Sequence, residues 1–213
     1  MEISTDGLIR KLEIFTTGGM VSSVKADMGE VEFSPEKIPV DFNALRDIAA
    51  VAKTAGPAGA PGQRQDCGLT QGGRIVNCPV MIAGEEYTIT CLSVGNAHCV
   101  VFVDNVHNLD LGSLGPKFEL NPAFPDRVNA EFVHVLDEKT LFVRTWERGN
   151  GETRACGTGA CAAAVAAVEN GFCQKDTDIT VKLPGGDLVI RYTGGRVYMT
   201  GGATKCFDGV VEI

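Results

Sequence analysis

The chain has 213 residues, of which 44% are hydrophobic and 22% are charged, and its formal net charge is −8. This length and hydrophobic content support a substantial core and argue against a disordered chain. The acidic balance argues against nucleic-acid and anionic-membrane partners, because such partners need clustered Lys and Arg on the protein surface.

Strand patterns open the chain. Residues 10–15 and 21–28 flank the turn pair Gly18 and Gly19, and this arrangement predicts a hairpin. An Ala-rich apolar pattern from Asp41 to about Lys53 predicts a short helix. The Gly- and Pro-rich stretch that follows predicts an irregular loop.

The rest of the chain is rich in strands. They are predicted over residues 80–82, 87–93, 99–103, 130–136, 140–146, 179–183, 188–192, 197–200 and 210–213. The clearest helix is predicted over 158–170, with Gly171 at the position of a C-cap. Small apolar residues occupy every face of this helix, which predicts burial on all sides. We therefore predict an α+β fold in which an antiparallel β-sheet curls around a central buried helix.

Cys156 lies at the head of this helix, in a run rich in glycine and charge. Glycines let the backbone approach a ligand closely, and the free N–H groups of a helix start favour an anion such as a carboxylate. The positive end of the helix dipole predicts a lowered pKa for the Cys156 thiol, and therefore proton exchange near neutral pH. The alternatives are a buried structural cysteine, or a dinucleotide-binding fingerprint over 157–162 that lacks the strand normally preceding it.

Two further clusters carry polar side chains. Asn96 offers amide donors and an acceptor, and His98 can donate or accept a proton near neutral pH, although a structural role fits His98 equally well. Asn129 begins a predicted strand after a Pro-marked turn. His107 and His134 have no supporting motif.

The eight cysteines need a separate interpretation. The spacing of Cys and His fits no zinc pattern, so we expect no metal. The N-terminal residues lack a secretion signal and no apolar run approaches the roughly 20 residues that span a bilayer. We therefore expect a cytoplasmic protein with reduced thiols and no membrane partner.

Together, these three clusters resemble the second half of the diaminopimelate epimerase family of lysine biosynthesis. The similarity is nearly residue by residue over 146–163, and it extends to 183–188, 197–201 and 207–213. It covers the chain from about Ile3 to Ile213 and fails only around 41–84. Ala97 departs from the family, which usually has Pro at this position, but both neighbouring functional side chains are kept.

The resemblance implies a cofactor-independent enzyme that interconverts LL- and meso-2,6-diaminopimelate. Two thiols would act on opposite faces of the α-carbon, one removing its proton and the other delivering one. Cys156 would be one of these catalytic groups, with Glu147 and His98 assisting. The residues implied in substrate binding are Asn96, Asn129, Glu147, Arg148, Gly157 and Thr158.

The resemblance also implies a domain organisation. Residues 1–40 would be remnant strands of an N-terminal epimerase domain, and 41–84 an insertion or linker. Residues 85–200 would form the complete C-terminal domain around helix 158–170, and 201–213 a closing strand. This diaminopimelate-epimerase-like fold would thus contain one complete domain and a remnant of a second.

The second catalytic thiol of the family is expected before Ile3 and does not occur in this sequence. Cys67 and Gly68 imitate its motif, but the residues after them do not form a small-residue helix. We therefore expect little activity from the chain alone, a homo-oligomer, and an N-terminal epimerase segment in trans as a candidate partner. Two alternatives stay open: a non-catalytic binding or partner module of the same fold, and a hydrolase with Cys156 as nucleophile and His98 as base.

Overall fold

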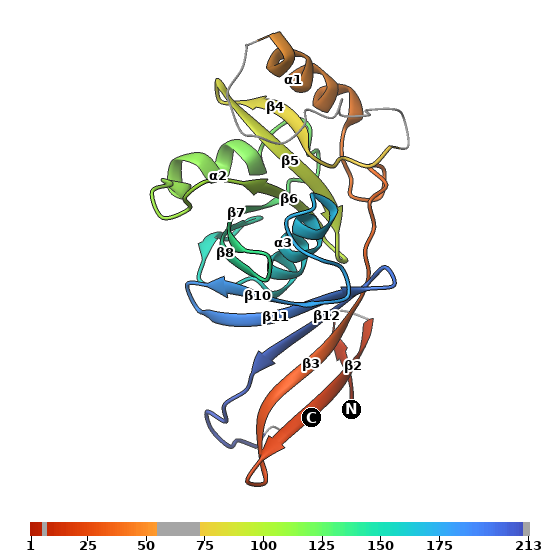
Figure 1. Ribbon diagram of the computed structural model, residues 1–213, viewed down its shortest axis with the longest axis vertical. Helices are drawn as coiled ribbons and strands as arrows, with labels where there is room; N and C mark the ends of the chain where they lie inside the picture. Colours follow the sequence, from red (N-terminus) through yellow and green to blue (C-terminus); the bar gives the residue numbers. More distant parts are fainter. Residues whose placement is uncertain (6–7, 55–72, 211–213) are drawn as a thin grey trace.

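The computed structural model describes residues 1–5, 8–54 and 73–210, and it has mixed α and β structure (Figure 1). The helices of this described part are α1 (Phe42–Thr54), α2 (Leu111–Glu119) and α3 (Gly157–Glu169). The strands are β1 (Glu2–Thr5), β2 (Leu8–Thr17), β3 (Met20–Glu30), β4 (Cys78–Ile82), β5 (Glu85–Ser93), β6 (Ala97–Phe102), β7 (Asn129–Asp137), β8 (Thr140–Glu147), β9 (Gly151–Thr153), β10 (Asp178–Leu183), β11 (Gly186–Thr193) and β12 (Arg196–Gly202).

The strands form one strongly curved sheet in the order β1-β2-β3-β12-β11-β10-β8-β7-β6-β5-β4, with β9 paired to β8. Most neighbours are antiparallel, as predicted, but β6 pairs with β7 and β8 pairs with β10 in parallel. A helix lies within the connection of each parallel pair, α2 for the first and α3 for the second. Parallel neighbours need such long crossovers, so the two helices account for the departure from the predicted antiparallel sheet.

Helix α3 lies inside the curl of the sheet, which confirms the predicted architecture (Figure 1). All nine residues from Gly159 to Ala167 are buried, and they share a core with side chains of the surrounding strands. The helix begins and ends one residue earlier than predicted. Gly171 adopts a φ of +77° just after the C-cap, and Phe172 N–H donates to Ala167 C=O at 2.9 Å, as in a Schellman motif.

A second core lies between the sheet and the helices α1 and α2. Phe118 of α2 packs edge-on against both Tyr87 and Phe132, with ring centroids 5.1 and 5.2 Å apart. The sequence patterns did not predict α2, because it contains Pro116 and two glycines. One of these, Gly115, is required by close packing: a Cβ there would lie 2.1 Å from the Trp146 ring.

Strands β2 and β3 form the predicted N-terminal hairpin, which projects from the body of the molecule beside β12 (Figure 1). The predicted strand over 210–213 is not observed at Val210, and its other residues lie outside the described part. The predicted loop at 55–63 and Cys67 also lie outside it. The division of the chain into 1–40, 41–84, 85–200 and 201–213 stays a prediction.

The cysteines differ in their bonding. Free thiols occur at Cys91, Cys99, Cys156, Cys161, Cys173 and Cys206. Cys78 is disulfide-bonded, so the expectation of reduced thiols is wrong for this residue. None of the helices in the described ranges is long and apolar enough to cross a membrane.

Candidate active site

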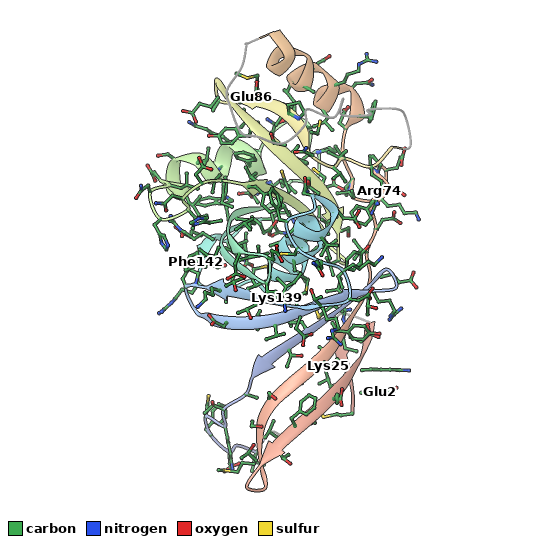
Figure 2. All side chains as sticks on the ribbon, in the orientation of Figure 1. Glu2, Lys25, Arg74, Glu86, Lys139 and Phe142 are labelled. Atoms are coloured by element: carbon green, nitrogen blue, oxygen red, sulfur yellow. The ribbon has the colours of Figure 1, made fainter. Side chains whose placement is uncertain are left out.

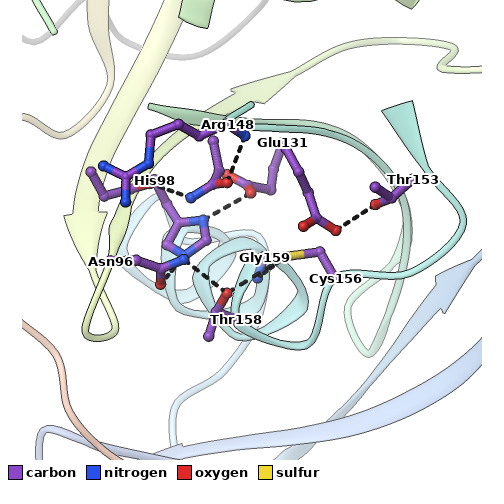
Figure 3. A network of polar contacts seen from close by, with 11 residues as sticks. Asn96, His98, Glu131, Arg148, Thr153, Cys156, Thr158 and Gly159 are labelled. Atoms are coloured by element: carbon purple, nitrogen blue, oxygen red, sulfur yellow. Dashed lines mark hydrogen bonds and ion pairs between the residues drawn. The ribbon is translucent and has the colours of Figure 1, made fainter. Parts of the chain in front are cut away.

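The polar clusters of the sequence meet at the start of α3 (Figure 3). The parallel pairing of β6 with β7 brings His98 directly opposite Asn129. The antiparallel pairing of β7 with β8 then places Ala130 opposite Trp146, one residue before Glu147. Three segments far apart in the chain are thus aligned by strand register beside the first turn of α3.

Cys156 is the N-cap of α3, with extended backbone angles of φ −130° and ψ 112°. Its sulfur accepts a hydrogen bond from Gly159 N–H at 3.3 Å and lies 3.5 Å from Thr158 Oγ1. Only 8% of the residue is exposed. The neighbouring glycines also serve packing, since a Cβ at Gly157 would lie 3.1 Å from the sulfur of Met199.

The environment raises the pKa of the Cys156 thiol to about 11, chiefly through burial and then through the negative charge of Glu131. Glu147 raises it further, whereas the hydrogen bonds from Thr158 and Gly159 lower it. The predicted lowering of this pKa is therefore wrong. The donors at the helix start are present, but loss of hydration and two nearby carboxylates outweigh them.

His98 is fully buried and both of its ring nitrogens have partners. Nδ1 lies 2.8 Å from Glu131 Oε1, and Nε2 lies 2.8 Å from Asn96 Oδ1 (Figure 3). The sequence reasoning did not identify Glu131. The signal that could have found it is a carboxylate within an otherwise apolar strand, because a buried charge needs a partner.

The two predicted asparagines have different surroundings. Asn96 Nδ2 donates to Thr158 Oγ1 at 3.3 Å, which connects the β5–β6 turn to α3. Asn129 is buried, and its amide donates to Ala97 C=O at 2.8 Å and accepts from Arg148 N–H at 3.0 Å. Asn129 therefore holds the backbone around Arg148 in place, in addition to any contact with a ligand.

Glu147 and Arg148 end β8 and begin the turn that leads to β9. The carboxylate of Glu147 accepts a hydrogen bond from Thr153 Oγ1 at 2.5 Å, and Arg148 Nη1 donates to Asp126 C=O at 3.1 Å. The turn thus places the negative Glu147 near the thiol, and the positive Arg148 side chain follows directly after it in the same turn. Opposite charges in one place suit a substrate that carries both an ammonium and a carboxylate group.

A second buried carboxylate, also missed by the sequence reasoning, supports this turn from α2. Glu119 Oε1 accepts from Gly149 N–H at 3.0 Å, and its Oε2 accepts from the Trp146 indole at 2.7 Å. Arg127 Nη1 forms an ion pair with Glu119 Oε1 at 3.4 Å. Residues on both sides of Glu147 and Arg148 are therefore fixed by Glu119.

Among the described residues, no group of three or more His, Cys, Asp or Glu side chains could hold a metal ion. The chemistry available in this part of the chain is that of a thiol, an imidazole and carboxylates next to helix N–H donors. Such groups hold anions and move protons.

Sequence comparison relates the chain to one family. A family model described as diaminopimelate epimerase matches residues 90–206. A diaminopimelate epimerase of Acetivibrio thermocellus is 42% identical over 215 residues, covering 100% of this chain and 66% of the relative. A diaminopimelate epimerase of Synechocystis sp. is 43% identical over 192 residues, which cover 89% of this chain and 59% of the relative. The chain thus spans less than two thirds of the length of these relatives.

Solved structures of low sequence identity share the fold. A predicted epimerase from Pseudomonas aeruginosa has a TM-score of 0.55 at 16% identity, with 94% of this chain and 62% of that chain covered. A hydroxyproline epimerase from Agrobacterium vitis has a TM-score of 0.56 at 12% identity, with 92% and 55% covered. These likenesses concern the fold alone.

Proposed function

The chain belongs to the diaminopimelate epimerase family, and on this premise we propose that it acts in the interconversion of LL- and meso-2,6-diaminopimelate, with Cys156 as one of two acid–base thiols. The observation that carries the proposal is the position of Cys156 as N-cap of α3 inside the matched region, with its sulfur among polar side chains. The reaction class is an isomerisation that needs no cofactor.

The substrate's reacting end carries a carboxylate and an ammonium group. Gly157 and Thr158 are the first residues of α3, so their N–H groups have no acceptor within the helix and suit the carboxylate. Arg148 adds a positive charge, and Glu147 suits the ammonium group. Asn96, Asn129 and His98 complete the proposed binding and assisting groups.

The proposed proton transfer is balanced between two thiols. In one direction, a thiolate on the far face of the α-carbon takes the proton while the Cys156 thiol delivers its own to the near face. The electron pair is held meanwhile by the carboxylate, which the helix N-terminus stabilises. The reverse direction needs Cys156 as the thiolate, and the positive ammonium group of the substrate favours that form.

The proposed reaction needs a second base on the opposite face of the α-carbon. Among the described cysteines, Cys156 is the one hydrogen-bonded to the site's polar groups. We expect the second thiol to come from an N-terminal epimerase segment, supplied in trans if necessary, and we expect a homo-oligomer. Residues 1–213 by themselves should therefore show little epimerisation.

The geometry favours this function over a hydrolase with a Cys–His pair. Both ring nitrogens of His98 already have hydrogen-bond partners, and the contacts that connect His98 to the sulfur of Cys156 pass through Asn96 and Thr158. His98 therefore does not take a proton directly from Cys156. A non-catalytic binding module would keep the same contacts, so only turnover separates it from an epimerase.

The test is exchange of the substrate α-proton in D2O, followed by NMR with both stereoisomers. We expect slow exchange with the chain alone and faster exchange when the remaining segment of the Acetivibrio thermocellus relative is added. The Cys156→Ser variant should abolish the gain, whereas Cys206→Ser, at an exposed thiol, should keep it. Calorimetry without binding heat for diaminopimelate would contradict the proposed substrate. Binding without any exchange in the reconstituted sample would favour the binding module.

A further inference from the structure

Glu131 is a fully buried carboxylate on β7 that the mechanism above does not use. One of its oxygens, Oε1, contacts His98, while Oε2 is buried without a hydrogen-bond partner in the described structure. An unsatisfied buried carboxylate oxygen destabilises a fold, and native proteins contain few of them. Its presence beside the thiol points to a role in the chemistry of the site.

The pair fixes the protonation of His98 at one nitrogen. An ionised carboxylate accepts hydrogen bonds and donates none, so the 2.8 Å contact requires a proton on Nδ1 of His98. The other nitrogen, Nε2, faces Asn96 Oδ1, which only accepts, so Nε2 carries a second proton in this orientation of the amide and loses it only when the amide is turned over. Carboxylates select the tautomer of a histidine in this way at many functional sites.

A continuous series of contacts connects this pair to the sulfur. It runs from His98 Nε2 to Asn96 at 2.8 Å, from Asn96 to Thr158 Oγ1 at 3.3 Å, and from Thr158 to Cys156 Sγ at 3.5 Å. When His98 is charged, its Nε2–H donates to Asn96, the Asn96 amide donates to Thr158, and the Thr158 hydroxyl donates to the sulfur. When His98 is neutral and the Asn96 amide is turned over, each of these hydrogen bonds is reversed, and the thiol donates to Thr158.

Direct packing also brings Glu131 close to the thiol. A Cβ added at Gly159 would lie 2.8 Å from Glu131 Oε1 and 3.2 Å from the sulfur of Cys156. Gly159 therefore leaves the space in which carboxylate and thiol approach each other. The other titratable groups that interact with the sulfur are Glu147 at the end of β8 and Cys161 on α3, whereas His98 on β6 is connected to it only through Asn96 and Thr158.

We propose that Glu131 is a positioning residue, which keeps a proton on Nδ1 of His98 and links the second proton of His98, on Nε2, through Asn96 and Thr158 to the proton of Cys156. The proposal rests on the proposed function in one respect, namely that Cys156 is an acid–base group. Glu131 contributes charge and orientation, and it does not touch the substrate. Together with burial, which is the larger effect, its negative charge keeps Cys156 protonated in the free protein, ready to act as the acid.

The first test uses Glu131→Gln, which keeps the size of the side chain and removes its charge. Glutamine can donate to or accept from His98, so ¹⁵N NMR should show the Nδ1–H form in the wild type and a mixture of tautomers in the variant. Alkylation of Cys156 by iodoacetamide, followed by peptide mass spectrometry, should show a midpoint about one pH unit lower in the variant. Glu86→Gln, at the opposite end of β5 from the turn that carries Asn96, is the matched control and should change neither (Figure 2).

The second test uses Thr158→Val, which is nearly isosteric and lies at the partly exposed start of α3. Loss of one donor to the sulfur should raise the alkylation midpoint by about half a pH unit. A wild-type His98 that lacks a proton on Nδ1, or unchanged midpoints in both folded variants, would overturn the proposal. Both readouts are made without substrate, so a failure of diaminopimelate turnover leaves them intact and concerns the proposed function alone.

Discussion

The backbone nitrogen of Gly159 lies 3.3 Å from the sulfur of Cys156 and donates a hydrogen bond to it. This contact is the one that a helix start offers to an anion, and it favours the thiolate. The same helix start is buried beside Glu131, which favours the thiol. Burial and the negative charge of Glu131 outweigh the hydrogen bond from Gly159, so the pKa of the Cys156 thiol is raised and the thiol stays protonated at neutral pH.

Alkaline pH should weaken the fold through Cys156. Its pKa is about 11 in the folded protein, against an ordinary value of 9.0, so above about pH 9 the unfolded chain releases this proton first. The unfolded state then binds fewer protons, and the free energy of unfolding falls as the pH rises from about 9 to about 11. Urea unfolding at several pH values should show a shallower decrease for Cys156→Ser. An unchanged slope would contradict the raised pKa.

Gly115→Ala should destabilise the protein by at least about 1–3 kcal/mol through overpacking. The added Cβ would lie 2.1 to 2.5 Å from three atoms of the Trp146 ring. Gly112→Ala, in the same helix, is the matched control because its Cβ would meet only Asp110 Oδ1, at 3.4 Å. Denaturant midpoints should fall for the first variant and stay level or rise for the second. Equal midpoints would mean that α2 does not approach β8 so closely.

Glu119→Ala should lower the free energy of unfolding by about 1–3 kcal/mol, because it leaves the Trp146 indole and the Gly149 N–H without their acceptor. Trp146 is the single tryptophan of the chain, so its fluorescence reports this site directly. We expect a shifted emission maximum and a lower unfolding midpoint. Glu138→Ala, in the exposed β7–β8 turn, should change neither. An unshifted emission maximum in Glu119→Ala would argue against the hydrogen bond to the indole.

Acid should weaken the fold through Glu32. Hydrogen bonds from Lys37 and Ser34 lower the pKa of this carboxyl to about 2, from an ordinary value of 4.5. Its stabilising contribution is therefore present above about pH 4.5 and is lost as the pH falls toward 2. Between pH 5 and pH 2.5, the midpoint temperature of thermal unfolding should decline less steeply for Glu32→Gln than for Glu36→Gln, a variant at an exposed neighbouring residue. Identical declines would contradict the lowered pKa.

Periodicity located most elements of the fold, because it is a local property of the chain. Alternating apolar residues predicted strands that the structure confirms as β5, β7 and β8, and the small-residue run predicted α3 to within one residue. Helix α2 escaped prediction because Gly115 and Pro116 disfavour helix in isolation, while close packing against Trp146 requires the glycine. The role of Glu131 was not predicted for a related reason, since its partner His98 lies 33 residues away in the chain.

The sequence by itself determined that Cys156 begins a buried helix next to a charged turn, because helix start signals and glycine spacing are encoded within a few residues. Only the tertiary structure decided what this thiol is: buried, close to Glu131, and connected to His98 through Asn96 and Thr158. The register of β6 on β7 sets these neighbours, and burial sets the strength of the electrostatic interactions between them. Both depend on the folding of the whole sheet around α3, which no local pattern contains.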